Sequence, residues 1–212
     1  MNIVRARTAG RADRESGFSL VEVVVAIAVL GILSTASLGV YLSGINSATT
    51  QQRREIAIAL ANSAMEKATA APIANLTAGR GTDAVQSRWT ANSSVPGVST
   101  TYKAFESGAP VNSYGTLPIL DTAEVNGTKY TIDTLVGSCF QMKAAVGVPP
   151  AGACTTTSGW PTQPAVPSNR IKLTRIIVVV RWTAGAGCAN GSCNYHTATL
   201  LDSSPELVWN AP

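Results

Sequence analysis

The sequence predicts an α+β protein in which a long N-terminal helix packs on a C-terminal antiparallel β-sheet head. Residues 18–71 join an apolar run to a helix-periodic stripe, and several later segments are rich in β-branched and aromatic residues. The 212 residues suffice for one ordinary domain plus a long extra element. We therefore expect a basic leader at 1–17, a membrane helix at 18–45, its amphipathic continuation at 46–71 and a globular head at 72–212.

The apolar run is long enough to cross a membrane. No charged residue occurs from Val23 to Gln52, and Val, Ile, Leu and Ala dominate from Phe18 to Tyr41, which reaches the ~20 residues that a spanning helix needs. Basic residues precede the run and no comparable cluster follows closely, so the N-terminus is expected in the cytoplasm and the head outside. The basic residues are Arg5, Arg7, Arg11 and Arg14, opposed only by Asp13 and Glu15.

Glu22 is the feature that an ordinary membrane signal leaves unexplained. A cleaved secretory signal needs small residues just after the apolar run, yet the A-x-A motif at 57–59 lies too far away. A plain signal anchor accounts for everything except Glu22, because a carboxylate in hydrocarbon costs roughly 2.5 to 3.5 kcal/mol or more. The simple alternative is that Glu22 lies near the helix start and reaches the headgroups.

The stretch Gly17-Phe18-Ser19-Leu20-Val21-Glu22, after a basic leader and before an apolar helix, closely resembles the processing site of type IV prepilins and type II secretion pseudopilins. The resemblance implies that a prepilin peptidase cuts between Gly17 and Phe18 and methylates the new amino group of Phe18. It also implies other pilin subunits, an inner-membrane assembly platform and, before assembly, membrane lipid as partners. The family often has a proline in the membrane segment, and this chain has none there.

The charge on Glu22 then has a physical purpose. A neighbouring subunit's Phe18 amino group carries the opposite charge, and joining the two groups relieves the desolvation of both in lipid. The surrounding apolar helices could otherwise slide past each other, so one polar pair can set their stagger, as one polar position does in a coiled coil. Glu22 and Phe18 are therefore the expected assembly residues.

Beyond the membrane the helix is expected to continue to a stop at Pro72. Ile56, Leu60 and Ala64 recur at helical spacing and form an apolar stripe opposite Arg53 and Arg54. A helix over 18–71 would be roughly 80 Å long, far longer than a bilayer requires. Its outer half should therefore pack on the head.

The head is expected to be an antiparallel meander of four strands, at 100–106, 129–137, 170–183 and 195–202. Both faces of the third strand are partly apolar, and one of them should meet the long helix. The order of the strands, with a central strand that ends in Trp, resembles the heads of PilV-type minor pilins.

Two stretches are expected to be irregular connections because they are polar or rich in Pro and Gly, one from Asn75 to Val98 and a long loop at 147–169. A loop of the second length is uncommon in a compact domain unless it is functional or disordered. Trp160 within it is either an exposed anchor or, as large aromatic residues more often are, buried against the sheet.

Four cysteines in an exported head predict disulfides. In the sequence CANGSC, the Asn190-Gly191 dipeptide favours a two-residue hairpin turn, which would set Cys188 and Cys193 opposite each other with Cα atoms about 4.5 Å apart. Cys139 and Cys154 then pair by elimination. A metal site made from these thiols and His196 would match no familiar zinc spacing, so neither metal nor cofactor is expected.

Composition and motifs argue against several functions. Charged residues make up 13% of the chain, and the net charge is +4. Arg53-Arg54 is the only adjacent basic pair, and so small a cluster of positive charge is too little for a nucleic-acid surface. His196 is the only histidine, and no G-x-S-x-G, H-E-x-x-H or phosphate-binding motif occurs, so no enzyme is expected. The sequence predicts a minor pilin of a type IV pilus. The alternatives are a type II secretion pseudopilin and a signal-anchored binding module that never polymerises.

Overall fold

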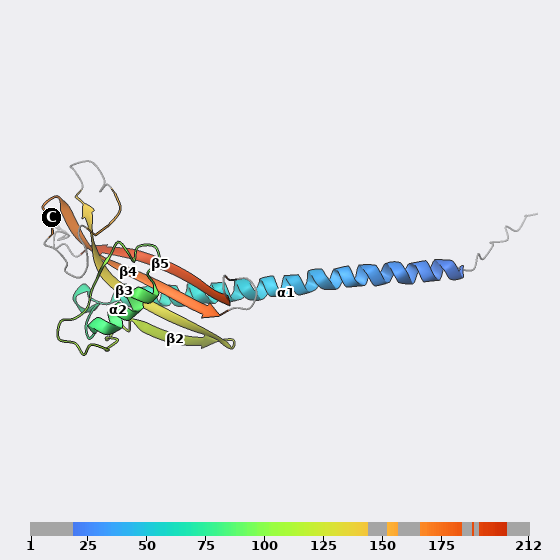
Figure 1. Ribbon diagram of the computed structural model, residues 1–212, viewed down its shortest axis with the longest axis horizontal. Coiled ribbons are helices and arrows are strands. Elements are labelled where there is room, and N and C mark those ends of the chain that lie inside the picture. Colours follow the sequence, from blue (N-terminus) through green and yellow to red (C-terminus); the bar gives the residue numbers. More distant parts are fainter. Residues whose placement is uncertain (1–18, 144–151, 157–165, 184–187, 189–190, 203–212) are drawn as a thin grey trace, which may run out of the picture. The chain divides into compact units, whose positions relative to one another are not determined.

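The computed structural model describes residues 19–143, 152–156, 166–183, 188 and 191–202. The chain divides into two compact units, one ending at Ser47 and the other beginning at Ala48. Figure 1 shows the elements. In chain order they are α1 (Leu20–Ala70), the 3-10 turn η1 (Ile73–Asn75), α2 (Thr82–Ala91), β1 (Tyr102–Lys103), β2 (Leu120–Val125), β3 (Thr128–Met142), β4 (Arg170–Thr183) and β5 (Ser192–Asp202).

Helix α1 is one continuous helix of 51 residues, as the sequence predicts. The Ser19 carbonyl accepts hydrogen bonds from the N–H groups of Glu22 (2.9 Å) and Val23 (3.2 Å), so Ser19 is the residue at which the helix begins. The helix ends at Ala70, two residues before Pro72, whose ring and missing N–H prevent further helical bonding.

The sheet of the head is antiparallel, with the order β1-β3-β4-β5 and with β2 paired to the first part of β3. The four expected strands are present in the expected meander. Strand β1 has only two residues, whereas β3 and β5 are longer than predicted, because β4 pairs with β3 from Tyr130 to Met142 and with β5 from Ser192 to Asp202. Strand β2 was not expected. A hairpin turn joins it to β3 at Asn126 (φ 51°) and Gly127 (φ 69°), a dipeptide that favours this turn.

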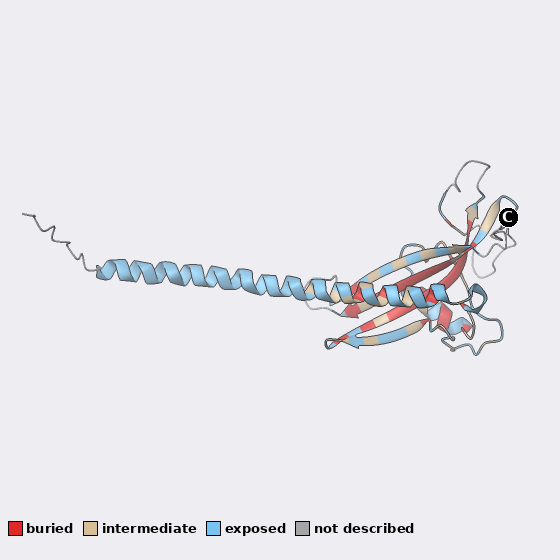
Figure 2. Ribbon diagram, turned by 180° about the vertical axis from the view of Figure 1, so that it is seen from behind, coloured by how far each residue is buried: buried red, intermediate tan, exposed pale blue. Residues whose placement is uncertain are grey.

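One face of the sheet packs on the part of α1 that belongs to the head. Figure 2 shows buried residues along this part of α1 and on the strands that face it. Small side chains on the helix let the two backbones approach closely, and large side chains on β4 fill the space between them. The fully buried helix residues are Ala57, Ala61 and Ala68, and the β4 residues in the same cluster are Ile176, Val178, Val180 and Trp182.

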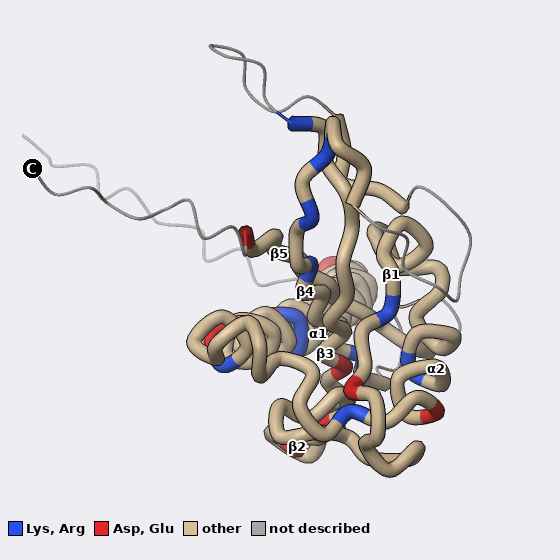
Figure 3. Tube along the Cα trace, turned by 90° about the vertical axis from the view of Figure 1, so that its left-hand side faces the viewer, with Lys and Arg blue, Asp and Glu red and all other residues tan. Residues whose placement is uncertain are grey.

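The opposite face of the sheet is covered by α2, so the expectation of an irregular connection from Asn75 to Val98 is wrong. Figure 3 shows α1 and α2 on opposite sides of the sheet. Val85 and Trp89, one helical turn apart, are buried against Ile177 and Val179 of β4. The head is therefore a helix–sheet–helix sandwich, and β4 is apolar on both faces because both are covered.

Candidate functional site

The first unit contains a helix whose exposed apolar surface would be unfavourable in water. Every residue of α1 from Leu20 to Thr49 is exposed, including Leu20 at 80% and Val40 at 75%. Among the described residues, α1 is the one helix that is long and apolar enough to cross a membrane, judged by length and composition alone. Such a surface needs lipid or the apolar surface of another helix around it.

Polar side chains within this apolar stretch differ in whether they have a hydrogen-bond or ion-pair partner in the chain. The Thr35 hydroxyl donates to the carbonyls of Gly31 (3.2 Å) and Ile32 (2.9 Å), and the Ser37 hydroxyl donates to that of Leu33 (2.8 Å). These groups need no outside partner in lipid. Glu22, in contrast, is exposed in the first turn and makes no ion pair within the described part of the chain.

Glu22 lies where a helix favours an anion. The free N–H groups of the first turn give the helix N-terminus a partial positive charge, which stabilises a carboxylate there. Its expected partner Phe18, and Gly17 on the other side of the expected cleavage site, lie outside the described residues. Cleavage between them, methylation of Phe18 and its pairing with Glu22 therefore remain predictions.

The head contains two disulfides that join the pairs favoured by the sequence. Cys139 of β3 is bonded to Cys154 with Cα atoms 5.3 Å apart, and Cys188 is bonded to Cys193 of β5 with Cα atoms 5.1 Å apart. Beside the first disulfide, Phe140 and Thr155 exchange two backbone hydrogen bonds of 2.8 and 3.0 Å. The chain after β3 is thereby held back against β3.

The expected local geometry of the second disulfide is wrong. Cys193 lies opposite Trp182 and Ser192 lies opposite Thr183, so Cys188 is not the cross-strand neighbour of Cys193. The β4–β5 ladder reaches Thr183 because Trp182 is buried on the face toward α1. The disulfide therefore joins β5 to a residue that lies outside the β4–β5 ladder, and the Gly191 N–H donates to the Cys188 carbonyl at 3.2 Å.

Arg175 of β4 binds two loops to the sheet. Its Nη1 donates to the Gly97 carbonyl (3.1 Å) and to the hydroxyls of Thr100 (3.0 Å) and Thr101 (2.8 Å), and its Nη2 donates to the Cys154 carbonyl (2.6 Å). Burial lowers the pKa of the Arg175 guanidinium from its ordinary value. The role of this residue is therefore to position loops.

A second buried charge holds α2 on the sheet. Asp133 of β3 is fully buried and forms ion pairs with Arg181 of β4 and, at 3.8 Å, with Arg88 of α2. Asn92, which caps the end of α2, donates from Nδ2 to Asp133 Oδ2 at 3.0 Å. Breaking such a network leaves a buried charge unpaired, so these residues specify how α2 docks.

Arg80 is a third buried charged residue, and its guanidinium donates hydrogen bonds to backbone carbonyls. Its Nη1 donates to the Thr134 carbonyl (3.0 Å), and Nε and Nη2 donate to the Leu117 carbonyl (3.1 and 2.9 Å). Burial lowers the pKa of Arg80 to about 10, so the guanidinium is still charged at neutral pH. It fastens the chain before β2 to β3.

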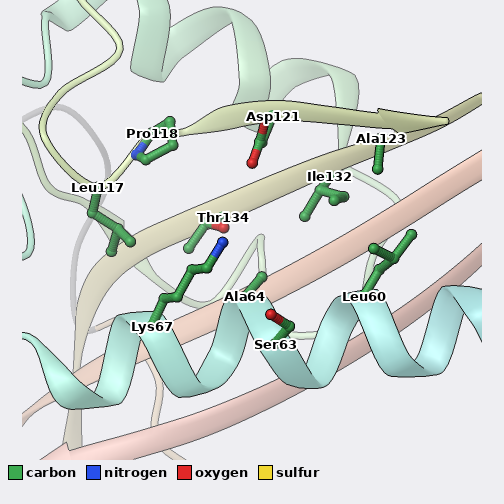
Figure 4. A pocket seen from close by; sticks show the side chains of 10 residues that line it. All are labelled: Leu60, Ser63, Ala64, Lys67, Leu117, Pro118, Asp121, Ala123, Ile132 and Thr134. Atoms are coloured by element: carbon green, nitrogen blue, oxygen red, sulfur yellow. The ribbon is translucent and has the colours of Figure 1, made fainter.

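A pocket of 210 Å³ lies between the head part of α1 and strands β2 and β3 (Figure 4). Its floor is mostly apolar, and Lys67 and Asp121 contribute opposite charges without an ion pair between them. No cluster of three metal-ligating side chains occurs among the described residues, and His196 lies exposed on β5. The pocket is lined by Leu60, Ser63, Ala64, Lys67, Leu117, Pro118, Asp121, Ala123, Ile132 and Thr134.

Sequence reasoning found Glu22 and the cysteines but not the three buried charges of the head.

Comparison with known families matches residues 13–38 to a family model described as the prokaryotic N-terminal methylation motif. Comparisons with curated proteins and with solved structures find no match. The matched residues include Glu22 and the start of the exposed apolar part of α1, and the chain therefore carries the prepilin-type N-terminal methylation motif of type IV pilins and pseudopilins, which are structural proteins rather than enzymes.

Proposed function

We propose that the protein is a minor pilin of a type IV pilus, of the PilV type. A prepilin peptidase cleaves it between Gly17 and Phe18 and methylates Phe18. The mature chain stays in the inner membrane with its head outside, until its N-terminal helix enters a filament built with other pilin subunits. A type II secretion pseudopilin is the alternative within the same class, because the methylation motif is common to both.

The observation that carries this proposal is the position of Glu22. It is the only carboxylate between Phe18 and Gln52, it lies within the matched motif, and it begins a helix stretch whose side chains are all exposed. A carboxylate without a partner is unfavourable in lipid, and the amino group that cleavage creates at Phe18 of a neighbouring subunit is a partner of opposite charge. Assembly then satisfies both charges and covers the apolar helix.

The head supports a structural role. Helix α1 continues from the apolar stretch into a sandwich held by two disulfides, the Arg175 contacts and the Asp133 network. A filament subunit needs a rigid head that remains folded outside the cell, and disulfides suit that compartment. The minor role is supported by the Pro- and Gly-rich sequence at 147–169, most of which, with Trp160, lies outside the described residues, and by the PilV-like strand order.

The first experiment determines the N-terminal residue and the mass of the protein isolated from its native membrane. The proposal expects an N-methylated Phe18. A bulky substitution, Gly17→Leu, should leave the intact precursor in the membrane, because the peptidase must fit the chain at this position. Gly31→Leu is the matched control, since space is open around Gly31 and it should be processed normally.

The outcomes separate the three candidates. An intact Met1, or normal maturation of Gly17→Leu, would reject the prepilin route in favour of a signal-anchored module that does not polymerise. Methylated Phe18 leaves pilus and pseudopilus, which are told apart by whether deleting the pilus or the secretion assembly machinery removes the protein from sheared surface material.

A further inference from the structure

Strand β5 gives the head an unusually open edge. All eleven of its residues pair with β4, from Leu173↔Asp202 to Thr183↔Ser192, and within the described chain no strand pairs with its other side. From Ser192 to Leu201 it contains no Lys, Arg, Asp, Glu or Pro. Natural edge strands usually carry charges, prolines or bulges that prevent pairing with another chain. This edge lacks the usual charges and prolines and is a template for an added strand.

The opposite edge has a different character. Strand β2 is only six residues long, pairs only with β3 among the described strands, and presents exposed carboxylates at Asp121 and Glu124. Figure 1 shows β2 and β5 at opposite margins of the head sheet. An acidic strand meets no like charge on β5 before Asp202. Just beyond the end of the β4–β5 ladder, β4 carries the half-buried Arg170 and the exposed Lys172, so the two margins are electrostatically compatible.

Strand direction decides how two copies can meet through these edges. The pairs β2–β3, β3–β4 and β4–β5 are all antiparallel, so β5 runs antiparallel to β2. A β5 edge can therefore pair antiparallel with β2 of a second copy that has the same orientation. Antiparallel β5–β5 or β2–β2 pairing would instead reverse one copy, including residues 48–70 of its α1. Pairing β2 with β2 would also bring carboxylates together.

From this we propose that the β5 edge of one head accepts strand β2 of a second copy of this chain, which extends the sheet from head to head. The inference rests on the proposed function, because copies held in one membrane by α1 must share their orientation. The contact joins two different surfaces, so two copies that lie side by side can form it without either one being reversed. Parallel β5–β5 pairing would also keep α1 in the same direction, but it would turn one copy over and close as a dimer.

The faces of the two strands give the contact a charge signature. Glu124 pairs with Lys129, and Ala198 pairs with Ile177, which belongs to the α2 side of the sheet. Ile132 and Tyr130 alternate with Lys129 and face α1, so Glu124 also faces the α2 side. A carboxylate placed on that face of β5 would therefore meet Glu124 of the incoming strand.

The experiment uses the full-length chain in its native membrane, expressed as two differently tagged copies. One copy carries a photoreactive side chain at position 122 on β2, and cross-linked peptides are identified by mass spectrometry. Cross-links to residues 192–202 of the other copy are expected. A photoreactive group at position 111, in the exposed loop before β2, is the control and should give few of them.

Charge variants then test the pairing itself. Asn194→Glu and Ala198→Glu place an acid in the two halves of β5, and at least one of them should lower the cross-link yield about two- to fivefold, because like charges on facing strands repel. Glu124→Lys in the other copy should restore that yield. Asn194→Lys and Ala198→Lys are the matched controls and should not lower the yield, which separates charge repulsion from damage to the fold.

Three results would overturn the inference: no cross-link to β5, equal yields with Glu and Lys on β5, or no rescue by Glu124→Lys. Cross-links from β5 to β5 would replace it with a closed dimer. The N-terminal residue is measured in the same sample. A methylated Phe18 without these cross-links rejects only the head contact, whereas an unprocessed Met1 rejects the proposed function.

Discussion

The two parts of α1 share one helix but have opposite surroundings. From Leu20 to Thr49 every residue is exposed, whereas Ala57, Ala61 and Ala68 are completely buried against the sheet. In the proposed membrane and filament, the large apolar side chains of the first part contact lipid or another helix, and these partners adapt to their shape. The second uses alanine because its partner is a rigid sheet of the same chain. Helical periodicity alone therefore indicates little about what a helix face contacts.

The largest effect is expected from the one carboxylate of the apolar part. Glu22→Val should leave membrane insertion intact but reduce incorporation into filaments by at least about tenfold, because the polar pair that sets the stagger is lost. Immunoblots of sheared surface material and of membranes measure the two pools. Glu55→Val, an exposed carboxylate in the head part of the same helix, is the control and should assemble normally. Equal incorporation of Glu22→Val would contradict the pairing.

The next largest effect is expected from removing the disulfides, both of which lie in the head. Replacing Cys139 and Cys154 by Ser opens a loop with a sequence separation of 15 and should cost about 3 kcal/mol of head stability. The same change at Cys188 and Cys193, with a separation of 5, should cost about 2 kcal/mol. Denaturant unfolding of the detergent-solubilised chain measures both. A larger loss from the second pair would show that loop closure is not the main contribution.

Overpacking the helix–sheet contact should have a somewhat smaller effect. Ala61→Leu inserts three carbon atoms where no space exists and should cost about 1–3 kcal/mol. Ala59→Leu, on the exposed side of the same turn, and Ala26→Leu, in the apolar part, should leave the unfolding midpoint nearly unchanged. If all three variants melt alike, the close contact at Ala61 does not stabilise the head.

The smallest effect concerns a single hydrogen bond at the start of the head. The Tyr130 hydroxyl donates to the Arg53 carbonyl at 3.3 Å, so Tyr130→Phe should cost about 0.5–1.5 kcal/mol. Burial raises the pKa of Tyr130 above 10.0, an effect that the nearby Arg53 charge reduces. The folded state then keeps this proton longer than the unfolded state, so stability falls as pH rises above about 10.

Tyr130→Phe removes the ionisable group and should therefore lose this part of the alkaline decline. Parallel denaturation curves of the two proteins at pH 8 and above pH 10 measure it. An identical decline in both proteins would mean that the folded environment of Tyr130 does not perturb its ionisation.

The sequence predicts the parts of the molecule whose signals are local. The methylation motif, the long helix and strands β3 and β4 depend on continuous runs or strict alternation, and all are present. Helix α2 was missed because its only apolar repeat is Val85 and Trp89, one turn apart in a polar segment. Strand β2 was missed because Asp121 and Glu124 weaken its alternation, although Asn126-Gly127 marks the turn after it.

The buried charges could not be predicted from the chain alone. Arg80, Asp133 and Arg175 belong to residue types that are almost always at the surface, and only the fold supplies the carbonyls and counter-charges that make their burial possible. The same holds for the second disulfide. The short spacing between Cys188 and Cys193 predicts that they pair. That Cys188 lies outside the ladder depends on how far β4 continues, and it continues past Trp182 to Thr183.

The position of β4 in the chain has a consequence for export. Ala57 and Ala61 pack on Ile176, Val178 and Trp182, which lie far later in the sequence. In the proposed topology the N-terminus stays in the cytoplasm and the head crosses the membrane in chain order, so the head part of α1 arrives outside well before the strand that covers it. In that topology the head part of α1 is at first without its partner surface, and the helix–sheet contact forms only after β4 has crossed the membrane.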